Sequence, residues 1–179
     1  MSMHPLSVIV RPKASLDVGW FARHAASGIP PSDRYAVTAL DTGIRVEAIW
    51  EPDVDALVEQ VERATGFELL VSEPEVHYIL GPWVLEPILK VEASIPEELI
   101  GAVCGDMNRR RGAIQSLEVR EGQQAAVVAL IPLASLFGYK TILDELTGGQ
   151  ASVVAYFHDY WPGPPGWEGD ESSGAAVRA

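Results

Sequence analysis

The chain has 179 residues, of which 47% are hydrophobic, and its 25 acidic and 13 basic side chains give a formal charge of −12. This length allows one domain or two small ones, and the hydrophobic fraction predicts a globular protein with a core. The charge excludes a general nucleic-acid binder, because affinity for phosphates comes mainly from clustered lysine and arginine. It still permits a small basic patch on an acidic body.

Cys104 is the only cysteine, which excludes a disulfide framework and a cysteine-based zinc cluster. The N-terminus does not have the pattern of a signal peptide, and no apolar run approaches the ~18 residues of a membrane span. We therefore expect a cytoplasmic protein with no membrane partner. The histidines share no metal-ligand spacing, so we expect no metal and no other cofactor; they are His4, His24, His77 and His158.

The first half of the chain alternates strand-like and helix-like segments. Short apolar runs predict strands, and apolar residues at helical spacing predict helices between them. Pro52 in the first turn and Gly66 at the end mark the limits of the clearer helix. The predicted strands are residues 6–10, 34–40, 44–50 and 67–71, and the predicted helices are residues 15–26 and 51–66.

The second half repeats this order. A helix is predicted from Pro96, with Ile100, Val103, Cys104 and Met107 on its inner face, so we expect Cys104 to be a core residue. A second helix is predicted after Gly138. The predicted strands are residues 83–95, 113–120, 125–132 and 151–161, the middle two forming a hairpin across Glu121 and Gly122.

Each half therefore predicts a β-α-β-β-α-β unit. The expected fold class is α+β, with two ferredoxin-like βαββαβ sandwiches in tandem, each with an antiparallel sheet. We expect domains at residues 1–80 and 83–161, with the boundary near Gly81 and Pro82. Residues 162–179 are rich in proline, glycine and serine and are predicted to form a disordered tail.

The second half contains four short motifs of one family, in order between residues 85 and 160. They are Leu85-Glu86-Pro87, Pro96-Glu97-Glu98, Asn108-x-Arg110-Arg111-Gly112 and Pro132-Leu133-x-x-x-Phe137-Gly138-Tyr139. With these motifs the second half resembles the fifth, C-terminal domain of bacterial elongation factor G and related translational GTPases. The resemblance implies a ribosome-facing surface.

The first half is similar to the third domain of the same factor, above all in the segment Phe-Glu-Leu-Leu-Val-Ser-Glu-Pro-Glu-Val-His-Tyr at residues 67–78. The family segment Gly-Met-Gly-Glu-Leu-His-Leu, which helps to couple that domain to the GTPase centre, does not occur on the strand at residues 44–50. These 179 residues also contain no Gly-x-x-x-x-Gly-Lys-Ser/Thr phosphate loop, so we expect no GTP binding. The chain resembles domains three and five joined without the GTPase, second and fourth domains.

Arg109, Arg110 and Arg111 are adjacent in this acidic chain and allow two interpretations. They could cap the helix that begins near Glu97, since cations at a helix C-terminus complement its dipole, with Gly112 as the left-handed cap residue. They could instead meet phosphates through their forked donors. We favour the phosphate contact slightly for the middle or last arginine and the cap for the others. Lys140 and Gln150 complete the candidate RNA or partner contacts.

The tripeptide Gly148-Gly149-Gln150 is also found in release factors that hydrolyse peptidyl-tRNA. Here it lies between a predicted helix and a predicted strand, where glycines are expected in a turn, so we interpret it as a turn. Gln150 replaces a family arginine, and Asp144 and Glu145 lie nearby. These changes remove positive charge from a loop expected to approach RNA.

We expect a protein that is not an enzyme and that binds the ribosome's factor-binding region, or another translation component, without hydrolysing GTP. No side-chain pattern indicates a nucleophile with its base, so no catalytic residue is expected. The alternative is a protein–protein interaction or dimerisation module, for example a homodimer through a sheet edge, that kept the fold but lost ribosome binding. The acidic surface fits this alternative slightly better.

Overall fold

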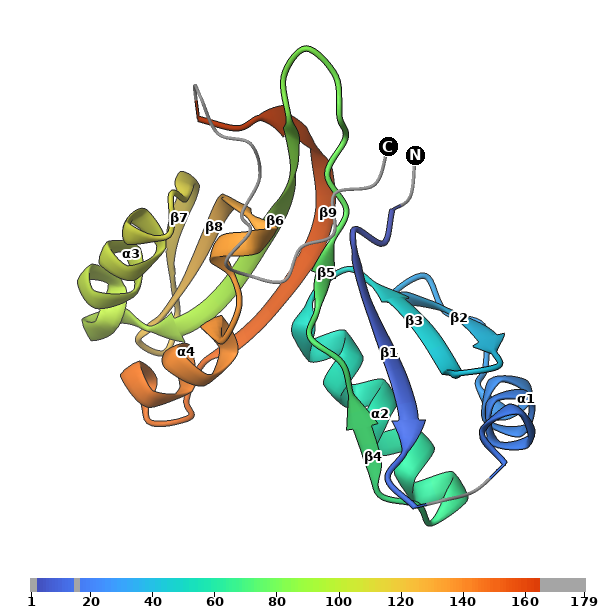
Figure 1. Ribbon diagram of the computed structural model, residues 1–179. Coiled ribbons are helices and arrows are strands. Elements are labelled where there is room, and N and C mark those ends of the chain that lie inside the picture. Colours follow the sequence, from blue (N-terminus) through green and yellow to red (C-terminus); the bar gives the residue numbers. More distant parts are fainter. Residues whose placement is uncertain (1–2, 15–16, 165–179) are drawn as a thin grey trace. The chain divides into compact units, whose positions relative to one another are not determined.

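The computed structural model describes residues 3–14 and 17–164, and its chain divides into two compact units between His77 and Tyr78. Each unit contains one antiparallel sheet and two α-helices, which confirms the α+β class and the two ferredoxin-like sandwiches expected from the sequence (Figure 1). The predicted disordered tail lies outside the described residues from position 165 onward. Its first residue, Pro162, belongs to the last strand.

The first unit has a sheet of strand order β2-β3-β1-β4, with the short β5 paired to β1. Leu6, Val8 and Val10 of β1 are buried, as are Phe21 of α1 and Leu57 of α2, so the sheet and both helices share one core. The elements are β1 (Leu6–Pro12), α1 (Val18–Gly28), β2 (Tyr35–Leu40), β3 (Gly43–Ala48), α2 (Glu51–Thr65), β4 (Leu69–Val71) and β5 (Glu75–Val76).

Local chemistry explains where the two helices of this unit begin and end. Helix α1 begins after Asp17, whose side chain accepts a hydrogen bond from the Trp20 N–H at 3.0 Å, as an N-cap residue does. Helix α2 has Pro52 in its first turn and ends at Gly66, which takes a left-handed φ of 72°. Both helices confirm the predicted elements.

The strand predicted at residues 67–71 is shorter in the structure. Strand β4 begins only at Leu69, because Phe67 packs edge-on against Phe21 of α1, with ring centroids 6.4 Å apart. The Leu69 N–H donates to the Glu62 carboxylate at 2.9 Å, which ties the start of this strand to α2. One further backbone bond, from the Lys13 N–H to the Glu68 carbonyl at 2.9 Å, continues the pairing just before β4, and Phe67 contacts the helix instead.

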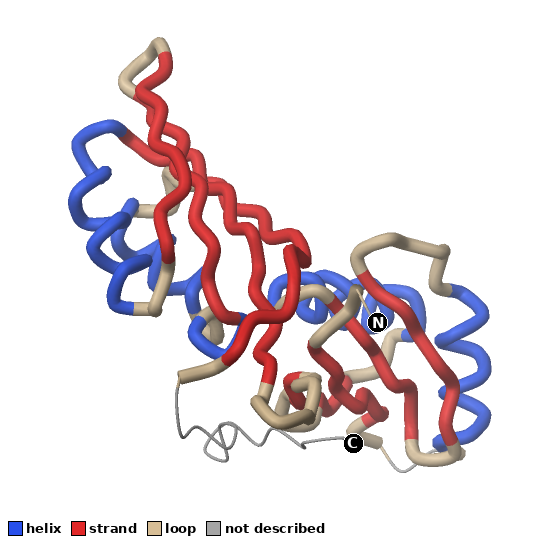
Figure 2. The backbone as a smooth tube through the Cα atoms, turned by 90° about the horizontal axis from the view of Figure 1, so that it is seen from above, coloured by secondary structure: helices blue, strands red, loops and turns tan. Residues whose placement is uncertain are grey.

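The second unit has the corresponding strand order, β7-β8-β6-β9, with all pairs antiparallel. Figure 2 shows its strands in red running side by side as a sheet, with helices in blue. The elements are β6 (Leu85–Pro96), η1 (Glu97–Leu99), α3 (Ile100–Arg109), β7 (Ala113–Arg120), β8 (Gln124–Pro132), η2 (Leu133–Ser135), α4 (Tyr139–Thr147) and β9 (Ser152–Pro162).

The inner face of α3 differs from the prediction. Val103 and Met107 are fully buried as expected, but the third buried residue is Asp106, and Cys104 is only half-buried. The assignment of Cys104 to the core was therefore wrong. Burial raises the pKa of its thiol, which keeps it protonated and weakly nucleophilic near neutral pH.

Strand direction sets the two ends of this sheet. At one end α3 finishes and α4 begins, near the start of β6, where Glu86 pairs with Trp161. At the other end α4 finishes and β9 begins, where Ser94 pairs with Ser152. We call these the arginine end and the glycine end of the second unit, after Arg109–Arg111 and Gly148–Gly149.

Candidate functional site

Helix α3 ends in a Schellman motif. The Gly112 N–H donates to the Met107 carbonyl at 2.9 Å, and the Arg111 N–H donates to the Asn108 carbonyl at 3.1 Å. The left-handed residue of the motif is Arg111, with φ at 62°, so the expectation that Gly112 would take this conformation was wrong. Gly112 is needed for space instead, because a Cβ there would lie 2.5 Å from the Met107 carbonyl oxygen.

Asp106 is the partner of two of the three arginines. The residue is 7% exposed, and its carboxylate accepts from Arg110 Nε at 2.7 Å and from Arg109 Nη2 at 3.3 Å. The spacing of three and four residues places all three side chains on one stretch of helix surface. The buried carboxylate is thus compensated by charge from its own helix.

Arg110 links the end of α3 to the segment before α4. Its Nη1 donates to the Ser135 carbonyl at 2.8 Å, and its guanidinium lies 5.0 Å from the ring centroid of Tyr139. Tyr139 is fully buried, and this burial raises the pKa of its hydroxyl. Because Arg110 is held by a carboxylate, a carbonyl and an aromatic face, its guanidinium serves the fold.

Arg111 neutralises a carboxylate on a different element. Glu86, at the start of β6, is 2% exposed and accepts from both terminal nitrogens of Arg111, with Nη1 at 3.1 Å from Oε2. This two-point geometry is the strongest form of an arginine–carboxylate pair. Glu86 was not singled out from the sequence as an ion-pair partner, and it lies 25 positions away, so no local spacing could have indicated it.

Arg109 is the most accessible of the four cations at the arginine end, Arg109 to Arg111 and Lys140. The Arg109 side chain is 71% exposed, the highest value in the run. Lys140, in the first turn of α4, forms an ion pair with Asp144 one turn later and is partly exposed. The structure therefore gives the most accessible guanidinium to the first arginine, whereas the sequence favoured a contact by the middle or last one.

Gln150 lies at the glycine end, away from the arginines. Gly148 and Gly149 both have left-handed φ values, 59° and 76°, and the Gln150 N–H donates to the Thr147 carbonyl at 3.2 Å. The tripeptide forms the turn between α4 and β9. The candidate residues thus divide into a cluster, Arg109 to Arg111 with Lys140, and a separate Gln150.

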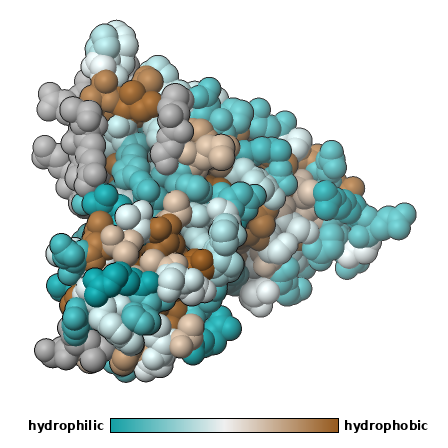
Figure 3. Space-filling view, turned by 90° about the vertical axis from the view of Figure 1, so that its right-hand side faces the viewer, coloured by the Kyte–Doolittle hydropathy of each residue, from teal (hydrophilic) through white to brown (hydrophobic). Residues whose placement is uncertain are grey.

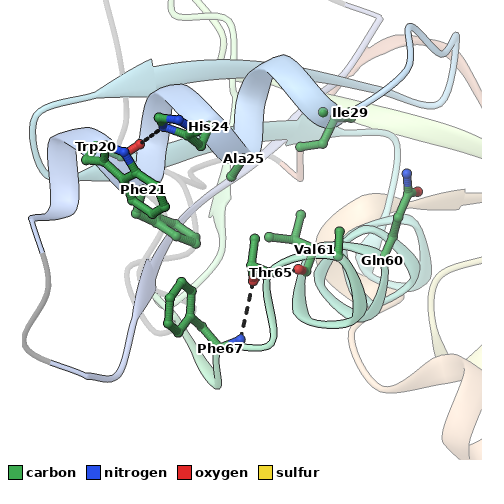
Figure 4. A pocket seen from close by; sticks show the side chains of 11 residues that line it. Trp20, Phe21, His24, Ala25, Ile29, Gln60, Val61, Thr65 and Phe67 are labelled. Carbon is green, nitrogen blue, oxygen red and sulfur yellow. Dashed lines mark hydrogen bonds between the residues drawn. The ribbon is translucent and has the colours of Figure 1, made fainter.

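A pocket of about 380 Å³ lies in the first unit between α1 and α2, and no sequence motif indicated it (Figure 4). Trp20 and His24 stack at its edge with ring centroids 4.1 Å apart, and His24 Nδ1 donates to the Trp20 carbonyl at 2.9 Å. Most of the lining is apolar: Phe21, Ala25, Ile29, Val61, Ala64 and Phe67. His24 and Thr65 also line the pocket, and each is hydrogen-bonded to a carbonyl of its own helix, Trp20 and Val61 respectively.

Two absences hold for residues 3–14 and 17–164. Within these residues, no group of three or more histidine, cysteine, aspartate or glutamate side chains is arranged to hold a metal ion. No helix in the same residues is both long enough and apolar enough to cross a membrane.

Comparison with known proteins shows what the chain is similar to. Residues 83–166 match the family described as elongation factor G C-terminus. The elongation factor G of Karelsulcia muelleri (strain GWSS) is 46% identical over 63% of this chain and 15% of its own length. The elongation factor G of Granulibacter bethesdensis (strain ATCC BAA-1260 / CGDNIH1) is 46% identical over 72% of this chain and 20% of its own length. The chain thus spans at most one fifth of these relatives' length, is similar to elongation factor G over most of its own length, and matches the C-terminal family of that factor at residues 83–166.

Proposed function

We propose that the protein is a non-catalytic, translation-factor-like protein that binds the ribosome, or another component of the translation apparatus, without hydrolysing GTP. The observation that carries this proposal is the match of residues 83–166 to the C-terminus of a factor that acts on the ribosome. Arg109 supports it, because an exposed guanidinium is a suitable donor to phosphate oxygens.

The contact we propose is small and local. The net charge of −12 opposes broad attraction to RNA, so binding must depend on a few cations close together. Arg109 ends α3 and Lys140 lies in the first turn of α4, and the bond from Arg110 to the Ser135 carbonyl joins the end of α3 to the segment before α4. The arginine end of the second unit is therefore the surface we assign to the ribosome.

GTP has no role in this proposal. Nucleotide hydrolysis needs a loop of converging backbone amides, a lysine and a hydroxyl for magnesium, which the Gly-x-x-x-x-Gly-Lys-Ser/Thr motif supplies. That motif does not occur in these 179 residues. Binding would depend on charge and shape alone, and the affinity should fall with salt in proportion to the number of phosphate contacts.

Co-sedimentation with ribosomes across a salt series tests the proposal. We expect the wild-type protein to pellet with ribosomes at low salt, and Arg109→Gln to pellet less. The salt dependence of the variant should be shallower by about one unit of slope, because one phosphate contact is lost.

The matched control is Arg63→Gln, which removes a similarly exposed helical arginine from the first unit. It should pellet like the wild type. If the wild-type protein stays in the supernatant at every salt concentration, the proposal of ribosome binding is wrong. If both variants lose co-sedimentation equally, the assignment of the contact to Arg109 is wrong.

A further inference from the structure

Strand β7 is an edge strand of the second unit and is unusually exposed. In the strand order β7-β8-β6-β9 it pairs only with β8. None of its eight residues is buried, and seven of them are exposed. One side of such a strand offers backbone N–H and C=O groups that another strand can pair with.

The side chains of β7 alternate between two chemistries. Leu117 and Val119 lie opposite the buried Val127 and Ala125 on the helix-covered face of the sheet, yet they are 42% and 57% exposed. Residues at alternate positions lie on the other face. The edge therefore exposes apolar surface on one face and charged groups on the other.

The charged residues of β7 have no compensation from the neighbouring strand. Glu118 lies opposite Ala126, and Arg120 lies opposite Gln124. Within the part of the chain that the structure describes, neither charge has an ion-pair partner. A carboxylate and a guanidinium thus stand two positions apart on an open edge, each available to an external group.

We propose that β7 pairs antiparallel with β7 of a second copy of this chain, about a two-fold axis at Val119. In this register Glu118 of each copy lies opposite Arg120 of the other, so two ion pairs form and the two Val119 side chains face each other. The two four-stranded sheets become one continuous sheet.

The charges select this register over the neighbouring one. Opposite residues of an antiparallel pair lie on the same face of the sheet, so the neighbouring register differs from this one by two residues. That register has its two-fold axis at Glu118 and would bring the two Glu118 carboxylates together. An irregularity between Ile114 and Ser116 limits the regular edge to residues 116–120. A short edge of this kind gives an association that depends on protein concentration rather than a permanent dimer.

Self-association of this kind is independent of ribosome binding. Val119 lies near the end of β7, at the glycine end of the unit, whereas Arg109 lies at the arginine end. A dimer could therefore form whether or not the arginine end contacts RNA, and each idea can fail alone.

Sedimentation velocity over a protein concentration series tests the pairing. We expect the average mass of the wild type to rise from one chain toward two. Glu118→Arg and Arg120→Glu should each require a concentration about tenfold or more higher, because like charges then face each other twice. The double variant Glu118→Arg/Arg120→Glu should associate like the wild type, since it restores both ion pairs.

An equimolar mixture of the two single variants gives the sharpest result. In a mixed dimer one chain carries two guanidinium groups on this edge and the other carries two carboxylates, so both cross-strand pairs are attractive. The mixture should therefore form dimers where each variant alone does not. Glu145→Arg, at an exposed site on α4, makes the same charge change as Glu118→Arg and should not alter association. Val119→Lys places two ammonium groups at the axis and provides an independent disruption.

Three outcomes would overturn the proposal. The wild type could remain one chain at every concentration, the single swaps could associate like the wild type, or the double variant and the mixture could stay monomeric. Circular dichroism of each variant shows that it is folded, and if one swap fails to fold, Val119→Lys decides the question by itself.

Discussion

Arg111 and Glu86 form a two-point ion pair between residues 25 positions apart, and Arg111 forms it from a left-handed backbone conformation with φ at 62°. A non-glycine residue in this region costs on the order of 1–2 kcal/mol. The pair compensates a carboxylate that is almost completely buried at the start of β6. The end of α3 therefore stores backbone strain in exchange for neutralising a charge on the sheet.

Replacing Arg111 should show which of these two effects is larger. Arg111→Gly relieves the left-handed strain but leaves the Glu86 carboxylate buried without its partner, so we expect a net loss of about 2 kcal/mol in the free energy of unfolding. Adding Glu86→Gln should recover part of that loss. Urea unfolding of both single variants and the double variant measures the coupling, and an Arg111→Gly protein as stable as the wild type would contradict this account.

Arg110 should matter more to stability than Arg109. Arg110→Gln removes the closer partner of the buried Asp106 and the bond to the Ser135 carbonyl, and we expect it to cost about 3 kcal/mol. Arg109→Gln removes a largely exposed partner and should cost less than about 1 kcal/mol. The comparison uses urea unfolding under one condition. Equal losses would mean that the three arginines act only through the helix dipole.

Asp53 should give the first unit a specific pH dependence. Burial raises the pKa of its carboxyl above 3.8, although the Arg34 guanidinium partly opposes this shift. Above pH 3.8 the folded state then holds more protons than the unfolded state, so the contribution of Asp53 to stability falls as pH rises through its folded pKa.

The free energy of unfolding of the wild type minus that of Asp53→Asn should accordingly decrease as pH rises from about 3.5 to 6. Both proteins are measured by urea unfolding across this range, and the other carboxylates cancel in the difference. A difference that grows with pH would mean that the bond from Arg34, 2.9 Å from the carboxylate, outweighs desolvation.

Gln150→Ala should leave both stability and ribosome co-sedimentation unchanged. Its side chain is exposed, and only its backbone N–H contributes to the turn after α4. Surface changes of this kind fall within about 0.5 kcal/mol. A protein that releases peptide from peptidyl-tRNA, and loses this activity on the substitution, would show that the Gly-Gly-Gln tripeptide is more than a turn.

Most of the fold follows from local pattern. Helix α2 was predictable because its apolar spacing, Pro52 and Gly66 all indicate the same helix, and the hairpin β7–β8 was predictable from two apolar runs around Glu121 and Gly122. The start of strand β4 was less predictable, because Phe67 is held by an aromatic contact with α1 that forms only in the folded unit. The positions of the exposed apolar residues, which are brown on the face shown in Figure 3, could not be predicted from local sequence pattern either.

The chemistry of the arginine end was only partly predictable. Asp106 precedes Arg109 and Arg110 by three and four positions, so helical spacing alone could have identified it as their partner. The pair of Arg111 with Glu86 depends on the end of α3 meeting the start of β6, which no spacing encodes. The left-handed Arg111 also contradicts the usual preference for glycine, because the steric need of the adjacent Gly112 is the stronger constraint.

The bond from Arg110 to the Ser135 carbonyl has a consequence for local opening of the second unit. It joins the last turn of α3 to the segment that leads into α4, while Tyr139 stacks beneath the same guanidinium. These two stretches cannot open separately without breaking a partly buried charged contact. Their backbone amides should therefore exchange with solvent deuterium as one cooperative group, at a slower rate than those of the exposed β7 edge.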